Sequence, residues 1–322
     1  MRTLAALVLL CGGLVASAAQ EQNYPSKPIR IVVSSAPGGM TDTLARTLGQ
    51  RLSASWGQHV VVENKPGANN QIGTEYVAKS PPDGHTLLLT PEVTFVINPH
   101  LYTKLSYDAD KDFAPITGLA SVNHALVVHP SLGVQTVQEL IALAKSKPGE
   151  LNYATLGIGS AAHLNMEMFQ GMTGVKLTPV HYRGATPALT DVVAGHVPMM
   201  FINIGSAAGA WKAGQVKILA IASPKRLSLF PDVPTIAESG VPGFEAQSWF
   251  GLFAPSATPR DIVVKINTEV QRILNDAEYR EKVLSPNTLE PIPNTPEGYA
   301  ALIKSDTEKW GRVIESAKLK IQ

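Results

Sequence analysis

Cysteine is nearly absent from the sequence, since Cys11 is the only one among 322 residues. It lies inside an apolar stretch over residues 4–15, and Leu10 stands directly before it, where a lipid-anchoring signal needs a small residue. We therefore expect no lipid on Cys11. Beyond this stretch, the lack of cysteine excludes disulfides, thiolate metal sites and a cysteine nucleophile.

Long hydrophobic runs are also lacking. After residue 15, no apolar run reaches the ~18 residues that a membrane-spanning helix needs. The stretch over residues 4–15 is itself too short, follows the basic Arg2 and precedes the small residues ASAA at 16–19, which together are typical of a secretory signal peptide. A buried N-terminal helix is the alternative. The polar, proline-containing segment at 20–28 favours a signal peptide over residues 1–19, with cleavage before Ala19 or Gln20.

Neither sign of charge dominates the chain. Lysine and arginine number 27 against 26 aspartate and glutamate residues, and the counts become equal once Arg2 is removed. Binding to nucleic acid through its phosphates requires a basic surface, so this balance argues against such a partner.

Catalytic and metal-binding motifs are missing as well. The sequence contains no HExxH pattern, no His/Cys cluster and no GxSxG elbow. Ser160 and His163 stand three residues apart, but no third residue is evident to orient the histidine. We therefore expect the protein to be no enzyme, with a hydrolase as the competing class, and to hold neither a metal nor a cofactor.

Strand-like and helix-like segments alternate along the chain. Residues 29–33 (IRIVV) form an apolar run, a turn follows at 36–39, and Leu44, Leu48 and Leu52 then recur on one helix face. Further strand-like runs lie at residues 60–62, 86–89, 180–182, 199–201 and 218–221. Such alternation predicts an α/β fold in which mostly parallel sheets are flanked by helices.

Capping residues predict where several helices begin. Thr136 with Glu139 forms a capping box, while Thr186 and Thr295 each stand before a proline that suits the first helical position.

The length predicts two lobes, because about 300 residues exceed one typical core. No flexible linker separates two halves, so we expect the chain to cross between lobes on paired strands, at residues 113–129 and back at 248–255. Lobe 1 would then comprise residues 24–122 with 247–322, and lobe 2 residues 123–246. A ligand cleft would lie between them.

The sequence resembles the Bug family, the solute-binding proteins of tripartite tricarboxylate transporters. The resemblance rests on several blocks that follow one another in family order: YPSKPIR at 24–30, PGGMTDTLAR at 37–46, VVENKPGA at 61–68, PDGHTLL at 82–88, NPHLY at 98–102, FAPI at 113–116, PDVPT at 231–235 and WFGL at 249–252. Together the blocks span almost all of the chain after the predicted signal peptide.

The resemblance implies a two-lobed periplasmic binding protein fold of type II, whose lobes close on a small carboxylate such as a dicarboxylate, an aromatic acid or an amino acid. It also implies export to the periplasm, a monomeric state, and delivery of the ligand to a two-subunit permease in the inner membrane. A binding protein that signals to a membrane sensor would keep the same cleft and stays an alternative.

In this family, backbone amides and ordered water hold most of the carboxylate. The loop at 34–39 (SSAPGG) suits this role, because glycines allow close approach and the following helix N-terminus favours an anion. The loop lacks the aromatic–proline pair common in the family, which implies a smaller and more polar wall. The candidates in lobe 1 are Ser35, Ala36, Gly38, Gly39, Thr41, Asp42 and Thr90, with capping or bracing as the stronger interpretation of Asp42.

In lobe 2, residues 157–163 (GIGSAAH) open a predicted helix with Ser160 as its N-cap, and YRGATP at 182–187 is the matching loop. The first segment also fits a GxGxxA dinucleotide pattern, but no acidic residue follows between Glu167 and Asp191, where that motif needs one. The candidates in lobe 2 are Ser160, His163, Arg183, Gly184, Ala185 and Asn203. For His163 a structural role, and for Arg183 an exposed charge, remain open.

Overall fold

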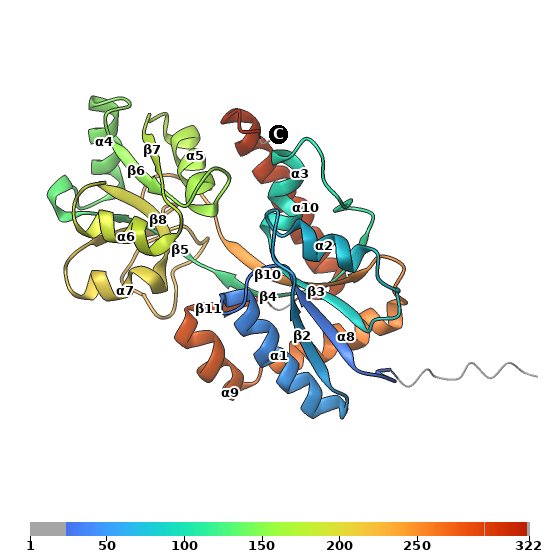
Figure 1. Ribbon diagram of the computed structural model, residues 1–322. Coiled ribbons are helices and arrows are strands. Elements are labelled where there is room, and N and C mark those ends of the chain that lie inside the picture. Colours follow the sequence, from blue (N-terminus) through green and yellow to red (C-terminus); the bar gives the residue numbers. More distant parts are fainter. Residues whose placement is uncertain (1–23, 293, 321–322) are drawn as a thin grey trace, which may run out of the picture.

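A computed structural model describes residues 24–292 and 294–320. The predicted signal peptide and Cys11 therefore lie outside the described residues. The chain forms two lobes, each built on one β-sheet (Figure 1). In the part that is described, no helix is long and apolar enough to cross a membrane.

Lobe 1 contains a six-stranded sheet in the order β11-β4-β10-β3-β1-β2. Its strands are β1 (Ile29–Val33), β2 (Val60–Asn64), β3 (Thr86–Pro91), β4 (Phe113–Val122), β10 (Ser248–Pro255) and β11 (Leu289–Pro291). β1 pairs in parallel with β2 and β3, whereas β10 runs antiparallel to β3 and β4, and β11 antiparallel to β4.

Lobe 2 contains a five-stranded sheet in the order β7-β6-β8-β5-β9. Its strands are β5 (His124–Val128), β6 (Asn152–Thr155), β7 (Thr178–His181), β8 (Met199–Asn203) and β9 (Lys217–Ile221). β6 is parallel to β7 and β8, whereas β5 is antiparallel to β8 and β9.

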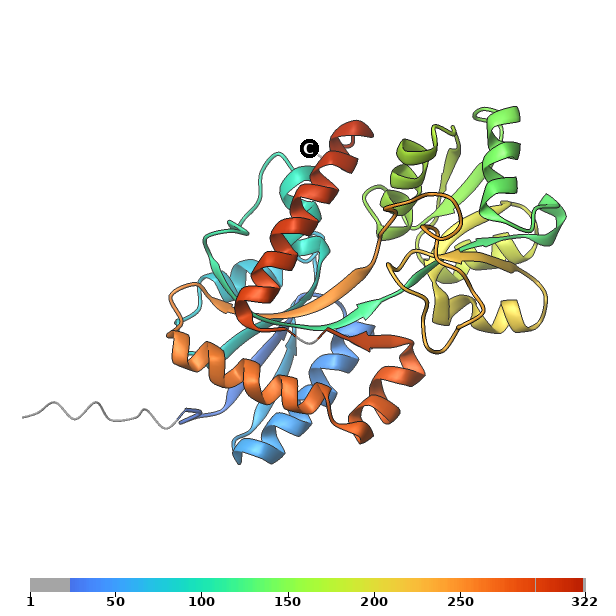
Figure 2. The same cartoon turned by 180° about the vertical axis from the view of Figure 1, so that it is seen from behind.

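Both sheets are mixed, so the expectation of mostly parallel sheets was wrong in this detail. The antiparallel pairs arise from the strands that carry the chain between lobes or return it at an edge, namely β5, β10 and β11. The two predicted crossings are present: β4 leads directly into β5, and β10 runs back beside β4 (Figure 2). At the crossing point the Gln247 Nε2 donates a hydrogen bond to Asn123 Oδ1 at 2.6 Å.

Helices cover both faces of the lobe 1 sheet because alternate strand residues face opposite sides. Ile31 and Leu87 pack in one cluster with α1 (Met40–Trp56) and α8 (Arg260–Leu274), and Val32 and Leu88 pack in another with α2 (Gln71–Ala78) and α10 (Pro296–Ser316). The predicted leucine stripe of α1 is confirmed, since all three leucines are buried. The shorter elements are η1 (Val93–Ile97), α3 (Asn98–Leu101), α9 (Ala277–Tyr279), η3 (Arg280–Leu284) and η4 (Ser285–Asn287).

The helices of lobe 2 are α4 (Val137–Ser146), α5 (Ala161–Thr173), α6 (Ala185–Val193) and α7 (Ile204–Lys212), with a short η2 (Pro130–Leu132). The predicted caps are confirmed for α4 and α10, where Thr136 accepts from Glu139 N at 3.2 Å and Thr295 from Gly298 N at 3.1 Å. The prediction for Thr186 was wrong, because α6 begins earlier, at Ala185. Its N-cap is Gly184, with φ 135°, a conformation that favours glycine.

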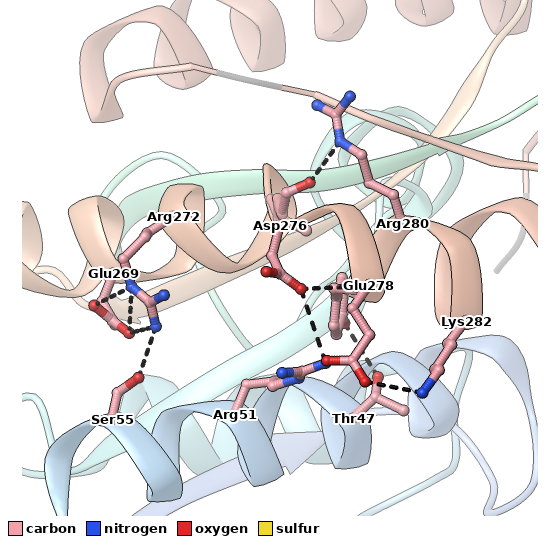
Figure 3. A network of polar contacts seen from close by, with 11 residues as sticks. Thr47, Arg51, Ser55, Glu269, Arg272, Asp276, Glu278, Arg280 and Lys282 are labelled. Atoms are coloured by element: carbon pink, nitrogen blue, oxygen red, sulfur yellow. Dashed lines mark hydrogen bonds and ion pairs between the residues drawn. The ribbon is translucent and has the colours of Figure 1, made fainter.

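A polar network holds the segment after α8 against α1 (Figure 3). Glu278 pairs with Arg51 at 2.8 Å and with Lys282 at 2.9 Å, and the buried Tyr279 shares a 3.1 Å hydrogen bond with Thr47. Such exposed ion pairs contribute little each, so the buried tyrosine is the main anchor. The segment continues to Thr288, which reaches lobe 2.

Candidate functional site

The topology points the carboxyl ends of several strands in each lobe toward the other lobe. β4 leaves lobe 1 at its carboxyl end, and β1 and β3 run in the same direction. β5 enters lobe 2 at the opposing edge, so β8, which is antiparallel to it, ends there, as do β6 and β7. The loops after β1, β6, β7 and β8 therefore face one another, where ligands of α/β folds collect.

The lobe 2 loops touch lobe 1 in two places. In one place, Leu101 covers Gly159 so closely that a Cβ on this glycine would lie 2.5 Å from Leu101 Cδ2. In another, Thr288 Oγ1 donates to Asn203 Oδ1 at 3.4 Å. Gly159 and Asn203 both belong to the lobe 2 loops predicted from the sequence, so these loops line the interface between lobes.

Asp42, in the first turn of α1, braces the loop at residues 34–39. Its Oδ2 accepts from the backbone N–H of Gly38 and from Arg46 Nε, both at 3.0 Å. Burial alone would raise the pKa of Asp42, but the hydrogen bonds from Arg46, Gly38 and Asn64 outweigh it and hold the pKa below its usual value. The bracing interpretation of Asp42 therefore fits the structure. The N–H of Gly38 is taken by this brace and is not free for a ligand.

Free donors remain at the entry to α1. Gly39 is the N-cap, and no side chain caps the helix. The backbone N–H groups of the first turn, including that of Thr41, therefore stay free to donate. Ala36 and Gly39 are exposed. Beside them, Ser35 Oγ is buried with no hydrogen-bond partner among the described residues. A buried hydroxyl normally has a hydrogen-bond partner, so the Ser35 hydroxyl is a candidate contact for a ligand.

Thr90, a candidate from the sequence, lies inside lobe 1, and so does Glu92 two residues later. The Thr90 hydroxyl is fully buried and forms a chain with Ser34 Oγ at 2.7 Å and Thr94 Oγ1 at 2.6 Å. Glu92 is also buried and accepts from Trp249 N at 3.3 Å, while its burial raises its pKa to about 7. Tertiary pairing with β10 encloses this end of β3, so neither side chain faces the interface.

A left-handed turn beside the 34–39 loop was missed from the sequence. Ala68, Asn69 and Asn70 all have positive φ, at 45°, 51° and 73°. Asn70 accepts a hydrogen bond from Ser34 at 3.3 Å, and Asn69 Nδ2 donates to Asn98 Oδ1 at 2.8 Å. The available signal was the Gly-Ala-Asn-Asn run, because asparagine tolerates this conformation better than most residues and strained turns cluster at functional sites.

Ser160 is the N-cap of α5, as predicted. Its Oγ accepts from His163 N at 3.3 Å and donates to Gly157 O at 2.8 Å. The hydroxyl is therefore occupied within its own loop. What this loop offers a ligand is the remaining backbone N–H groups of the first turn.

His163 is buried behind the same loop and does not face the interface. Its Nδ1 accepts from the backbone N–H of Gly159 at 3.2 Å, and its Nε2 lies 3.6 Å from Glu167 Oε1. Burial and the neighbouring His181 lower the pKa of His163 to about 4. The neutral imidazole holds the loop through the Gly159 N–H. This geometry fits the structural role that the sequence left open for His163.

The loop after β7 presents an unpaired cation. Arg183 is exposed, and no acidic side chain in the described ranges lies within ion-pair distance of it. Gly184 and Ala185 follow at the entry of α6, which has no side-chain cap. The loop thus offers a guanidinium next to free helix amides.

Asn203 ends β8, and its side chain both caps a helix and contacts lobe 1. Its Oδ1 caps α7 by accepting from Gly205 N at 2.7 Å and Ser206 N at 3.2 Å, and it also meets Thr288 of lobe 1. Only its Nδ2 is left for a ligand. Across residues 24–292 and 294–320, no three His, Cys, Asp or Glu side chains gather into a group that could hold a metal ion.

Comparison with known proteins agrees with this architecture. A family model described as tripartite tricarboxylate transporter family receptor matches residues 44–319. A solved R. palustris protein with adipate is 35% identical, with a TM-score of 0.79, over 92% of this chain and 100% of that one. The periplasmic binding protein BugD is 33% identical, with a TM-score of 0.74, over 92% and 100%. MatC from Rhodopseudomonas palustris with bound malate is 33% identical, with a TM-score of 0.73, over 90% and 100%.

Proposed function

Because the chain belongs to the tripartite tricarboxylate transporter receptor family, we propose that it captures a small dicarboxylate between its lobes and delivers it to a two-subunit permease of the inner membrane. The resemblance to the Bug family and the two-lobed binding-protein fold are confirmed. The protein is a carboxylate-binding periplasmic receptor and not an enzyme.

The proposal also covers the organisation of the chain. Residues 1–19 are the cleaved signal peptide, residues 24–122 with 247–322 form lobe 1, and residues 123–246 form lobe 2. The mature protein acts as a monomer. The relatives solved with adipate and malate support a ligand that carries two carboxylates.

The observation that carries the ligand assignment is the unpaired, buried hydroxyl of Ser35 at the uncapped entry of α1. One carboxylate accepts from this hydroxyl and from the amides of Gly39 and Thr41, where the helix dipole favours an anion. Ala36 forms the adjoining wall, and Gly38 shapes the turn.

The second carboxylate binds lobe 2. Arg183 supplies a charged pair and Gly184 and Ala185 supply backbone amides, with Asn203 Nδ2 beside them. Since the two anchors belong to different lobes, a ligand with two carboxylates favours the state in which the lobes are together.

Isothermal titration calorimetry with malate and adipate tests this assignment. We expect Ser35→Ala to weaken binding by about 1.5–3 kcal/mol, as for a hydrogen bond to a charged group, without loss of stability, because the hydroxyl has no partner in the free protein. We expect Arg183→Ala to cost about 2–5 kcal/mol if the pair is desolvated. Lys145→Ala removes an exposed charge from the outer surface of lobe 2 and is the control.

Unchanged affinity in both folded variants would show that the site lies elsewhere. If wild-type protein binds neither acid but binds an aromatic acid or an amino acid, the dicarboxylate assignment is wrong.

A further inference from the structure

A chain of partly buried polar contacts runs behind the Gly157–Ser160 loop along one face of α5. His163, Glu167 and Gln170 follow one another at positions i, i+4 and i+7 of this helix. Glu167 Oε1 accepts from Tyr153 OH and from Gln170 Nε2, both at 2.9 Å, and lies 3.6 Å from His163 Nε2. The contacts place a fixed carboxylate against one side of the imidazole.

The other side of the imidazole holds the loop. His163 Nδ1 accepts the N–H of Gly159 at 3.2 Å, which requires an unprotonated Nδ1 and therefore places the ring proton on Nε2, toward Glu167. Only 3% of His163 is exposed, and its ring stacks on Tyr153 at 6.4 Å and meets His181 edge-on at 5.6 Å. The ring thus has one orientation and one tautomer.

Gly159 is the residue on which this contact matters most. Its φ of 76° is a left-handed conformation. The position that a Cβ would take on Gly159 is filled by Leu101 of the other lobe. It also immediately precedes Ser160, the cap from which the free amides of α5 begin. A shift of Gly159 would therefore move both the interlobe contact and the anion-binding amides.

We infer that His163 is a positioning residue, which sets the Gly157–Ser160 loop for ligand binding through the Gly159 N–H and does not touch the ligand. The expected effect of His163 on ligand affinity rests on the proposed function, whereas its effect on the loop does not. Glu167, Tyr153 and His181 are the titratable groups that face the imidazole, from α5, β6 and the end of β7.

Two substitutions separate positioning from packing. His163→Asn retains an oxygen that can accept the Gly159 N–H, whereas His163→Leu retains apolar bulk without an acceptor. His85→Leu alters a comparably buried histidine in lobe 1, which is 8% exposed, and is the matched control.

The first measurement uses ligand-free protein. NMR of the wild type should show an unprotonated Nδ1 and a protonated Nε2 for His163 at neutral pH. Amide exchange of Gly159 should accelerate roughly 5- to 10-fold in His163→Leu, as expected for one lost hydrogen bond, and return close to wild type in His163→Asn. A protonated Nδ1, or unchanged exchange in a folded His163→Leu, would overturn the inference.

The second measurement is titration with malate and adipate. We expect affinity to fall about tenfold in His163→Leu, to recover in His163→Asn and to stay unchanged in His85→Leu. Equal losses in both His163 variants with normal Gly159 exchange would mean direct ligand contact and would also overturn it. If wild-type protein binds neither acid, the proposed ligand fails, while the exchange measurement still decides the role of His163.

Discussion

At the scale of single residues, burial decides what the ionisable groups do. Glu92 follows β3, where an exposed carboxylate would oppose an anionic ligand, yet it is 6% exposed and lies under β10. Burial raises its pKa to about 7, in spite of hydrogen bonds from Ser248 and Trp249, and the charge of Asp306 adds to the rise. Glu92 therefore affects the folding stability of lobe 1, and its carboxylate is not available to a ligand.

The raised pKa of Glu92 predicts a pH dependence. Between about pH 4.5 and 7 the folded state binds more protons at this group than the unfolded state does, so stability falls as pH rises through this window. Glu92→Gln keeps the shape and the acceptor for Trp249. We expect it to raise the free energy of unfolding by on the order of 2–3 kcal/mol above pH 7 and to change little below pH 4.5.

Urea unfolding from pH 4 to 8 measures this effect, with the exposed Glu245→Gln as the control. Parallel pH profiles for wild type and Glu92→Gln would contradict it.

At the scale of elements, the candidate loops are held by the helices that follow them. Asp42 in the first turn of α1 fixes the Gly38 N–H, and Asn64 at the end of β2 donates to Ser35 O at 3.1 Å. In lobe 2, Ser160, the N-cap of α5, and His163 in its first turn hold the 157–160 loop through Gly157 O and Gly159 N. Each loop therefore leaves its remaining amides in a fixed direction before the ligand arrives.

Asp42→Asn tests the brace in lobe 1. The pKa of Asp42 is depressed in the folded state, so its contribution is present above about pH 4 and is lost as pH falls further. We expect the variant to lose about 1–2 kcal/mol of stability at pH 7, and this loss to become smaller as the pH is lowered below 4. Thermal unfolding over a pH series from 7 downward measures this.

Asp261→Asn is the matched control, since Asp261 also lies in the first turn of a long helix but is exposed and braces no loop. A similar loss in both variants would indicate a helix-dipole effect alone.

At the scale of the whole molecule, two paired strands join lobes that already touch. One apolar cluster continues from Leu88 of β3 and Leu101 of α3 to Phe169 of α5, and α10 packs against α5. The crossing strands meet where Gln247 and Asn123 are hydrogen bonded, and we expect the lobes to hinge at this point. Separation of the lobes would expose the Leu101–Gly159 contact and part of the cluster.

Small-angle X-ray scattering tests closure. We expect protein saturated with its ligand to match the profile calculated from the structure, and ligand-free protein to have a larger radius of gyration, because the ligand favours the state in which both lobes bind it. Ser35→Ala with excess ligand should still reach the compact profile. Identical compact profiles with and without ligand would show that closure does not depend on the ligand.

The sequence by itself determined the class, the order of most elements and several of their ends. Apolar runs placed the strands, the leucine spacing placed α1, and Thr136, Ser160 and Thr295 placed three helix starts, because capping depends on residues three positions apart. The crossings at residues 113–129 and 248–255 followed from length and apolar character. The family blocks then indicated a carboxylate receptor and the loop that opens α1. The loop that opens α5 was found from the helix that it begins, with Ser160 as the N-cap.

Only the tertiary structure decided which of the candidate side chains face the interface. Glu92 is enclosed by Trp249, which lies 157 residues away in the sequence, and Thr90 by Ser34, which is 56 residues away. The mixed sheets likewise result from the return of β10 beside β3 and β4. Local chemistry fixes caps and periodicity, whereas burial, pKa and the assignment of free donors depend on neighbours that only the folded chain brings together.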